Sequence, residues 1–550
     1  MSHPNPSTAL ARTVIDELAH RGVRLFVVSP GSRSAALAIA AAVNQDSETR
    51  VVVDERSAAF HALGAARASG RPAAVVSTSG SAPTHFFPAI VEADASCVPL
   101  VAVSADRPTE LQGVGANQTM DQAHLFGDKV RAYAGIEAPD ASTDANLEWR
   151  GTIARLLGSA GGPTPGPVHL NVRFREPTVP ATDDGRTRGE TYPFATPRTG
   201  EGGTAPLASD IGEGEPEYPV LDGERGLVVA GDGVYDRADL ARVCGDLGWP
   251  VLATAMSGMR GGEVVTAYHH LLTDGVPESL RPQTVVAVGA IGPSPRLETL
   301  VASATWRVRI DRWGRSIDPG RDATHRLHGD VVALLARVDG PDPSGWREVW
   351  LETDRLRREE MKGLLGRAQS MTGAGVAAAL DDVSWETLVV SSSLPIREVD
   401  AHLTRGGRVL ANRGLSGVDG FVSTALGAAG ENQRVLAVSG DISMLHDGNG
   451  FIHDGDIDLT LVVIDNGGGG LFDSLPQARH APQYERLFVT PHHRRIEDLA
   501  QLHGLRYQEA DDAATLRRLC EDGLGRAGVD VIRVAVDRGA DLAMRDQLDG

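Results

Sequence analysis

Short, continuously apolar runs alternate with alanine-rich helical stretches over residues 5–180, and this pattern limits the possible folds more than any other feature. The runs lie at 25–28, 50–53, 74–77, 100–103 and 168–172, with helical stretches such as 34–43 and 57–68 between them. Strands that are apolar on both sides are typical of a parallel sheet covered by helices on each face. The pattern therefore predicts an α/β fold with a doubly wound parallel sheet.

The same alternation returns twice further along the chain. Apolar runs at 226–230, 251–253, 284–288 and 306–310 mark a second segment, and runs at 387–391, 409–411, 434–438, 459–464 and 531–536 mark a third. We expect a first domain at 1–182, a linker rich in Gly, Pro, Thr and Glu at 183–218, a middle domain at 219–345, a charged helical connection at 346–380 and a last domain at 381–550.

Composition excludes several functional classes. The formal net charge is −20, which argues against generic binding of nucleic acid. Three widely spaced cysteines cannot form a disulfide framework or a cysteine zinc site. The sequence contains no apolar run of the roughly 18 residues that a membrane helix needs, and its N-terminus lacks the pattern of a signal peptide. We therefore expect a soluble, cytoplasmic protein without stable membrane insertion.

Two polar motifs follow neighbouring apolar runs in the third segment. The run RVLAVS ends at Gly440-Asp441, and LTLVVI ends at Asp465-Asn466, 25 residues later counted from Asp441 to Asn466. Ligands of open α/β sheets bind at the carboxyl ends of the strands. A carboxylate and an amide oxygen suit Mg²⁺, which takes its remaining ligands from phosphates and water. The pair therefore predicts a site for a metal ion and a diphosphate, and the glycines at 467–470 allow close approach of the backbone.

Glu55 follows an apolar run and precedes a helical stretch in the first segment. An acid at this place can simply favour the start of a helix. It can also act as a buried proton donor whose pKa is raised by desolvation, and it could then hydrogen-bond an aminopyrimidine nitrogen.

Together these features resemble the thiamine-diphosphate-dependent enzymes, which pair such a glutamate with a Gly-Asp…Asn metal motif. Local stretches are similar to one family among them, the MenD synthases of menaquinone biosynthesis. They are SPGSRSAALA (29–38), DERSAAFHALG (54–64), TSGSAPTHFFPAIVEA (78–93), SADRPTELQGVGANQTMDQ (104–122), GPVHLNV (166–172), NRGLSGVDGFVSTALG (412–427) and GDISMLHDGNG (440–450). The similarity is strong in the first and third segments and faint in the second.

The resemblance implies a transferase with three doubly wound domains of the thiamine-diphosphate-binding fold: pyrimidine-binding, middle and diphosphate-binding. Its reaction decarboxylates 2-oxoglutarate and adds the succinyl carbanion equivalent to isochorismate in a 1,4-addition. The products are CO₂ and 2-succinyl-5-enolpyruvyl-6-hydroxy-3-cyclohexene-1-carboxylate (SEPHCHC). The implied cofactors are thiamine diphosphate and Mg²⁺ or Mn²⁺. The implied assembly is a homodimer or homotetramer with active sites between subunits.

The resemblance also assigns roles to residues. Glu55 would activate the cofactor, and Asn117 and Gln118 would orient substrate near the reacting carbon. The metal would be held by Asp441, Asn466 and the carbonyl of Gly468. The rest of the cofactor would contact Val418, Gly440, Ile442 and Ser443. Because both substrates carry two carboxylates, arginines should line the pocket, and the substrate-binding set is Ser32, Arg33, Arg107, Arg296, Ser393, Arg397 and Arg413.

Two places depart from the pattern of the family. The stretch containing Arg296 has Pro295-Arg296 where some relatives have a Lys-Arg pair, and the metal loop reads DNGGGG, so that Asp465 is either structural or a further metal ligand. We expect the stretch 491–495, PHHRR, to be a solvated turn or helix start rather than a zinc site.

Two other interpretations stay open from the sequence. One is a different thiamine-diphosphate enzyme, such as a decarboxylase or an acetolactate-type synthase, although these rarely need so many arginines at the site. The other is a catalytically silent binding or regulatory subunit with the same fold. The presence of Glu55, Asp441 and Asn466 together argues against a silent subunit.

Overall fold

The computed structural model describes residues 5–137, 143–179, 218–292, 294–432, 434–479 and 482–549. Apart from Tyr218, the predicted linker at 183–218 lies outside these ranges. The chain folds into two compact units that interleave along the sequence. The first unit combines the N-terminal part with residues 412–432 and 445–457, and the second holds the remainder from 218 onward.

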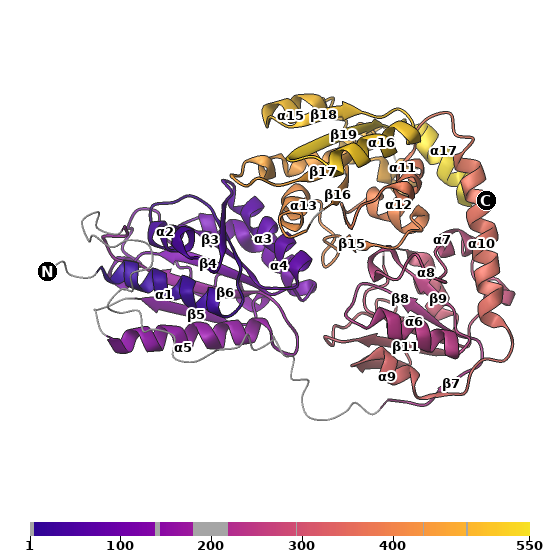
Figure 1. Ribbon diagram of the computed structural model, residues 1–550, viewed down its shortest axis with the longest axis horizontal. Helices are drawn as coiled ribbons and strands as arrows, with labels where there is room; N and C mark the ends of the chain where they lie inside the picture. Colours follow the sequence, from indigo (N-terminus) through magenta and orange to yellow (C-terminus); the bar gives the residue numbers. More distant parts are fainter. Residues whose placement is uncertain are drawn as a thin grey trace. The chain divides into compact units, whose positions relative to one another are not determined.

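The first unit is built on a six-stranded, all-parallel sheet (Figure 1). In spatial order its strands are β2 (Glu48–Val51), β1 (Leu25–Val28), β3 (Ala73–Ser77), β4 (Leu100–Asp106), β6 (Val168–Arg173) and β5 (Tyr133–Glu137). The central strands are buried along their whole length, as a sheet covered on both faces requires. The predicted doubly wound sheet of the first segment is confirmed.

Helices cover both faces of this sheet. They are α1 (Pro6–His20), α2 (Ala35–Val43), α3 (Glu55–Ser69), α4 (Phe87–Ala95) and α5 (Thr143–Ala160). One apolar core contains residues of α1, α2 and α5, and a separate core contains residues of α3 and α4. Alternate side chains of a strand point to opposite faces, so the same strands contribute residues to both cores.

Helix α13 (Phe421–Ala429) packs directly on α3 within this unit. Both helices carry a glycine where they meet. A Cβ atom at Gly64 would overlap the carbonyl oxygen of Thr424, and one at Gly427 would overlap the carbonyl oxygen of His61. Glycine therefore allows the two backbones to touch, which a larger residue at either position would prevent.

The middle segment forms a five-stranded parallel sheet. In spatial order its strands are β12 (His325–His328), β11 (Trp306–Asp311), β10 (Thr284–Val288), β8 (Gly226–Ala230) and β9 (Val251–Ala253). Two short strands, β7 (Leu221–Asp222) and β13 (Val338–Asp339), form a separate parallel pair. In the sequence, β7 precedes the strands of the five-stranded sheet and β13 follows them. Its helices are α6 (Arg237–Asp246), α7 (Tyr268–Leu271), α8 (Pro295–Ala302) and α9 (Val331–Leu335). The predicted charged connection contains α10 (Trp346–Leu365) and α11 (Gly373–Ala379).

The third sheet repeats the topology of the first. Its strands in spatial order are β15 (Arg408–Leu410), β14 (Thr387–Val390), β16 (Val435–Gly440), β17 (Leu459–Asp465), β19 (Val529–Ala535) and β18 (Arg506–Glu509). Numbered within each sheet, both follow the order 2-1-3-4-6-5 with every pair parallel. The remaining helices are α12 (Leu394–His402), α14 (Asp441–His446), α15 (Ile496–Leu502), α16 (Ala513–Leu524) and α17 (Arg538–Asp549).

These three sheets establish the predicted α/β class with doubly wound parallel sheets. The exact domain boundaries that the sequence predicts stay a prediction. Across the described ranges, none of the helices has both the length and the apolar character needed to cross a bilayer.

Candidate active site

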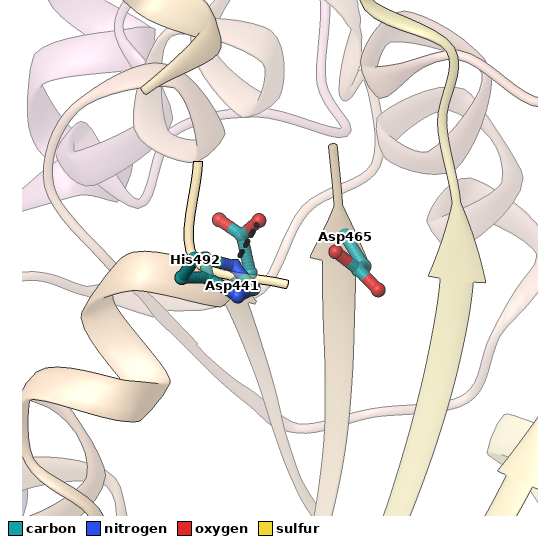
Figure 2. Close-up of side chains that lie close together, drawn as sticks. All are labelled: Asp441, Asp465 and His492. Atoms are coloured by element: carbon teal, nitrogen blue, oxygen red, sulfur yellow. Dashed lines mark hydrogen bonds and ion pairs between the residues drawn. The ribbon is translucent and has the colours of Figure 1, made fainter. Parts of the chain in front are cut away.

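The carboxyl ends of β16 and β17 bring three ionisable side chains together in the second unit (Figure 2). Asp441 follows the last residue of β16, and Asp465 is the last residue of β17. Because these strands are parallel neighbours, both carboxylates lie at the same edge of the sheet. His492 joins them, and the potential ligand atoms of all three lie within 4.8 Å of one another.

Asp441 is the most buried member of this group, with 1% of its surface exposed. Its Oδ1 accepts a hydrogen bond from the backbone N–H of Ile442 at 2.7 Å. Burial raises the pKa of Asp441, and the hydrogen bonds from His492 and Ile442 oppose that shift. A buried carboxylate that is costly to keep charged is typical of a site that receives a cation.

Asp465 is already engaged by the protein. Its Oδ2 accepts a hydrogen bond from Nε of Arg533 at 2.6 Å, and its Oδ1 accepts one from the backbone N–H of Gly467 at 3.2 Å. These contacts support the structural alternative for Asp465, because they hold the start of the glycine loop at the end of β17.

The glycine loop at 467–470 passes close to other backbone. Gly468 has a φ of +152°, and a Cβ atom there would overlap the carbonyl oxygen of Val489. The side-chain oxygen of Asn466 accepts a hydrogen bond from the N–H of Gly468 at 3.3 Å. The loop thus places the Asn466 side chain and the Gly468 carbonyl beside the end of β17. Their role as metal ligands stays a prediction.

His492 corrects one expectation from the sequence. The stretch PHHRR is not a solvated turn throughout, because the His492 side chain is only 12% exposed. Its Nε2 lies 3.1 Å from Oδ2 of Asp441. The two residues are 51 positions apart, so no local pattern could have signalled the contact.

Ser393 and Arg397 lie at the neighbouring strand end. Ser393 precedes α12 with a φ of +74°, and its carbonyl oxygen accepts a hydrogen bond from Arg397. The N–H of Gly440 lies 3.4 Å from the hydroxyl of Ser391, which links this loop to the end of β16. Burial lowers the pKa of Arg397, so the guanidinium occupies a place where an anion would be favoured.

The first unit gathers a second group of predicted residues at the carboxyl edge of its own sheet. Arg107 follows β4 and donates a hydrogen bond to the hydroxyl of Ser79. Burial lowers the pKa of Arg107, and the nearby charge of Arg33 adds to that shift. Arg33 donates to the carbonyl oxygen of Phe174 at 3.0 Å and forms an ion pair with Glu176 at 3.1 Å. Two neighbouring cations in the loops after β1 and β4 form a site suited to a multiply charged anion.

Gln118 reaches the same place through Ser79. Its carbonyl oxygen accepts a hydrogen bond from the Ser79 hydroxyl at 3.0 Å, and its side-chain amide donates to the Ser79 carbonyl at 3.1 Å. Gln118 has a φ of +53°, and both it and the adjacent Asn117 are exposed. Sequence reasoning missed Ser79, although it lies inside the quoted stretch TSGSAPTHFFP.

Glu55 is the first residue of α3 and is half-buried, not fully buried. Asp54 caps this helix by accepting hydrogen bonds from the N–H groups of Arg56 and Ser57. Both features agree with the helix-start role considered from the sequence, and neither conflicts with a role toward a cofactor.

Arg413 and Val418 belong to the segment 412–432, which is part of the first unit. The buried carboxylate of Glu92 anchors this segment by accepting hydrogen bonds from the N–H groups of Gly414 at 2.8 Å and Leu415 at 2.7 Å. Sequence reasoning also missed Glu92, the second-last residue of one of the quoted family-like stretches.

The Arg296 side chain forms an ion pair with another residue of the second unit. Asp549, near the end of α17, binds the Arg296 guanidinium through two hydrogen bonds of 2.9 and 2.7 Å. Ser32 lies exposed in the loop between β1 and α2, next to Arg33. The substrate-binding roles of Arg296 and Ser32 stay predictions.

Comparison with known proteins identifies the family. Residues 8–125 match the thiamine pyrophosphate enzyme family, N-terminal TPP binding domain. The SEPHCHC synthase of Thermobifida fusca (strain YX) is 39% identical over 99% of this chain and 98% of its own length. The chain belongs to the SEPHCHC synthase family. Other similar SEPHCHC synthases are those of Rubrobacter xylanophilus and Myxococcus xanthus, each 36% identical and covering 99% and 98% of this chain and 98% and 96% of their own lengths.

Membership of the SEPHCHC synthase family confirms the resemblance drawn from the sequence, including the thiamine-diphosphate-binding fold. It also excludes the acetolactate-type alternative as a family assignment. Family membership does not by itself establish the roles of individual residues, which stay predictions.

Proposed function

We propose that the chain decarboxylates 2-oxoglutarate and adds the resulting four-carbon unit to isochorismate, giving SEPHCHC and CO₂. The near full-length similarity to relatives named as SEPHCHC synthases carries this proposal. The paired arginines of the first unit add independent support, because both substrates carry two carboxylates.

Asp441, Asn466 and the carbonyl of Gly468 would hold Mg²⁺ or Mn²⁺. The residues present fit such an ion. Asp441 is a buried carboxylate, and the glycine loop brings oxygen atoms that can coordinate a metal to the same edge of the sheet. Backbone groups of Gly440, Ile442 and Ser443 lie at this edge and would contact the diphosphate. Thiamine diphosphate, when bound, supplies the electron sink that makes loss of CO₂ from a 2-oxo acid feasible.

Glu55 would hold a proton at the pyrimidine nitrogen of the cofactor. Its position at the first turn of α3 suits this role, because the helix fixes the backbone from which the carboxyl group extends. Val418 would support the bent shape of the cofactor, and its place in the segment anchored by Glu92 gives it a defined backbone.

The substrate carboxylates would be bound by two sets of residues. Ser393 and Arg397 lie next to the strand end that carries Asp441 and would receive the distal carboxylate of 2-oxoglutarate. The isochorismate carboxylates would be bound by Ser32, Arg33, Arg107, Arg296 and Arg413. Of these, Arg33 and Arg107 have the clearest structural support, since they lie close enough for the charge of Arg33 to lower the pKa of Arg107.

Asn117 and Gln118 would orient the substrates near the reacting carbon. Amide groups suit this place because they hydrogen-bond without supplying an acidic proton. The double contact of Gln118 with Ser79 fixes its backbone and side chain.

The proposed assembly is a homodimer or homotetramer with each active site completed by two subunits. We also propose that the enzyme works in the cytoplasm.

The direct test combines the purified protein with 2-oxoglutarate and isochorismate, with and without thiamine diphosphate and Mg²⁺ or Mn²⁺. We expect cofactor-dependent loss of isochorismate and a product with the mass of SEPHCHC. Glu55→Gln should slow the reaction at least about 100-fold, the usual range for loss of a group that handles a proton. Glu224→Gln, a change of an exposed glutamate in the middle sheet region, should react like the unmodified enzyme.

Other outcomes would reject specific parts of the proposal. Decarboxylation of 2-oxoglutarate while isochorismate persists would show that the acceptor is wrong. Binding of thiamine diphosphate without any turnover of 2-oxoglutarate would favour a silent subunit.

A further inference from the structure

His492 contacts the proposed metal ligand Asp441 but lies outside all the stretches that carry the family resemblance. Its Nε2 lies 3.1 Å from Oδ2 of Asp441, within hydrogen-bonding distance. The contact lies inside the second unit and joins residues that are 51 positions apart. Figure 2 shows the imidazole ring beside the Asp441 carboxylate, joined to it by a dashed line.

The other ring nitrogen decides which atom carries the proton. The backbone N–H of Arg494 donates a hydrogen bond to Nδ1 of His492 at 2.9 Å. A ring nitrogen accepts a hydrogen bond through its lone pair, so an accepting nitrogen bears no proton. In a neutral imidazole the proton is then on Nε2. Nε2 therefore donates to Asp441, and a nitrogen that carries a proton cannot coordinate a metal ion.

The backbone around His492 is shaped to hold this geometry. Thr490 and His493 flank Pro491-His492, and both have positive φ values, +48° and +52°. A β-branched residue rarely adopts such a conformation, so the surrounding contacts must hold it. Two of them are hydrogen bonds, from the N–H of Thr490 to the carbonyl of Glu485 at 2.8 Å, and from the N–H of Gly469 to the carbonyl of Val489 at 2.7 Å. The second bond ties the His492 loop to the glycine loop of the metal motif.

We propose that His492 is a positioning residue that orients the Asp441 carboxylate for the divalent metal. This inference rests on the proposed metal site. The carboxylate receives one donor on each oxygen, the N–H of Ile442 on Oδ1 and Nε2–H of His492 on Oδ2. Two donors fix the plane of the carboxylate, and each oxygen still has a lone pair for a cation. Residues that hydrogen-bond a metal ligand in this way commonly change metal affinity when they are replaced.

The test measures binding of Mn²⁺ to the full chain with saturating thiamine diphosphate, from the electron paramagnetic resonance signal of free Mn²⁺. His492→Ala removes the donor and should weaken Mn²⁺ binding about 10- to 100-fold. His492→Gln keeps a side-chain N–H that can reach Asp441, so it should bind within a few-fold of the unmodified chain. His493→Asn changes the exposed neighbour, tolerates a positive φ and should have no effect.

Each contrary result overturns a different statement. Equal Mn²⁺ affinity for His492→Ala and the unmodified chain would reject the positioning role. Weak binding by His492→Gln, as weak as by His492→Ala, would reject hydrogen-bond donation and favour a need for the imidazole itself. No Mn²⁺ binding by the unmodified chain would reject the proposed metal site and this inference with it. Thermal unfolding of the metal-free variants should match that of the unmodified chain, which separates loss of affinity from loss of fold.

Discussion

The buried carboxylate of Asp447 accepts a hydrogen bond from the hydroxyl of Ser57 at 3.1 Å. Ser57 lies two residues after Glu55 in the first turn of α3. The other oxygen of Asp447 accepts the N–H of Ser423 at 2.8 Å, and the Arg56 guanidinium lies 3.7 Å away. Asp447 therefore joins the start of α3, which carries Glu55, to the start of α13. Because all three segments belong to the first unit, this contact fixes the helix end from which Glu55 extends.

Replacing Asp447 should destabilise the protein. Asp447→Ala leaves the N–H of Ser423 without its acceptor in a buried place, which costs about 1–3 kcal/mol. The midpoint of urea unfolding should fall accordingly. Asp454→Ala is a suitable comparison, because Asp454 also accepts a backbone N–H, that of Val51, but does so at an exposed position. An equal loss for both variants would contradict the importance of burial.

Replacing Arg107 should reduce turnover through weaker capture of isochorismate. A charge-assisted hydrogen bond contributes about 1.5–3 kcal/mol, so Arg107→Ala should lower kcat/KM for isochorismate about 10- to 100-fold. The KM for 2-oxoglutarate should change little. Arg155→Ala, which changes an exposed arginine on α5, provides the control. A fall in kcat/KM for 2-oxoglutarate alone would show that Arg107 faces the other substrate.

Two adjacent glycines in the metal loop offer a matched pair of substitutions. Gly467 and Gly468 both have positive φ, +75° and +152°, so alanine at either position costs about 1–3 kcal/mol of backbone strain. Only Gly468→Ala also creates an overlap, with the Val489 carbonyl, whereas a Cβ at Gly467 meets nothing within 4 Å. We expect Gly468→Ala to weaken Mn²⁺ binding much more than Gly467→Ala. Similar affinities would show that the close approach at Gly468 is not needed.

The first unit should lose stability in mild acid because it buries neutral histidines. Burial lowers the pKa of His169 to about 3 and holds the pKa of His61 well below its usual value. Below pH 6.5 the unfolded chain takes up protons on these rings and the folded chain does not. Stability therefore falls as the pH decreases from 6.5 toward 3, by up to about 1.4 kcal/mol per pH unit for each ring.

The thermal unfolding midpoint, measured from pH 7.5 down to pH 5, tests this expectation. His169→Gln should flatten the dependence on pH, whereas His85→Gln, at an exposed position, should leave it unchanged. A variant of His169 with the full acid dependence of the unmodified chain would show that other groups control it.

The sequence predicted the central strands well because they are continuously apolar, as a doubly covered sheet demands. It predicted less at the sheet edges. The edge strands β5 and β18 are partly exposed and mixed in polarity, so no apolar run marks them. The strand predicted at 50–53 is displaced by two residues, since β2 is Glu48–Val51 and begins at an exposed residue.

For the site, residues at strand ends could be predicted because topology alone places them together. Asp441 directly follows β16 and Asp465 ends the neighbouring parallel strand β17, so their proximity can be predicted without knowing how the loops fold. His492, Ser79 and Glu92 were missed because their contacts depend on how separate loops fold back on the sheets. His492 in particular lies in a stretch whose local composition indicates only a polar turn.

The glycine contact between α3 and α13 affects how this gene could be divided. Residues 412–432 complete the N-terminal unit although the whole middle sheet separates them from it in the sequence. A fragment that stops near residue 180 would expose the face of α3 on which α13 packs, including the bare backbone at Gly64. Such a fragment should be prone to aggregation when it is produced alone, and co-production with the remainder of the chain should rescue it. The N-terminal sheet and the segment at 412–432 therefore depend on each other for folding.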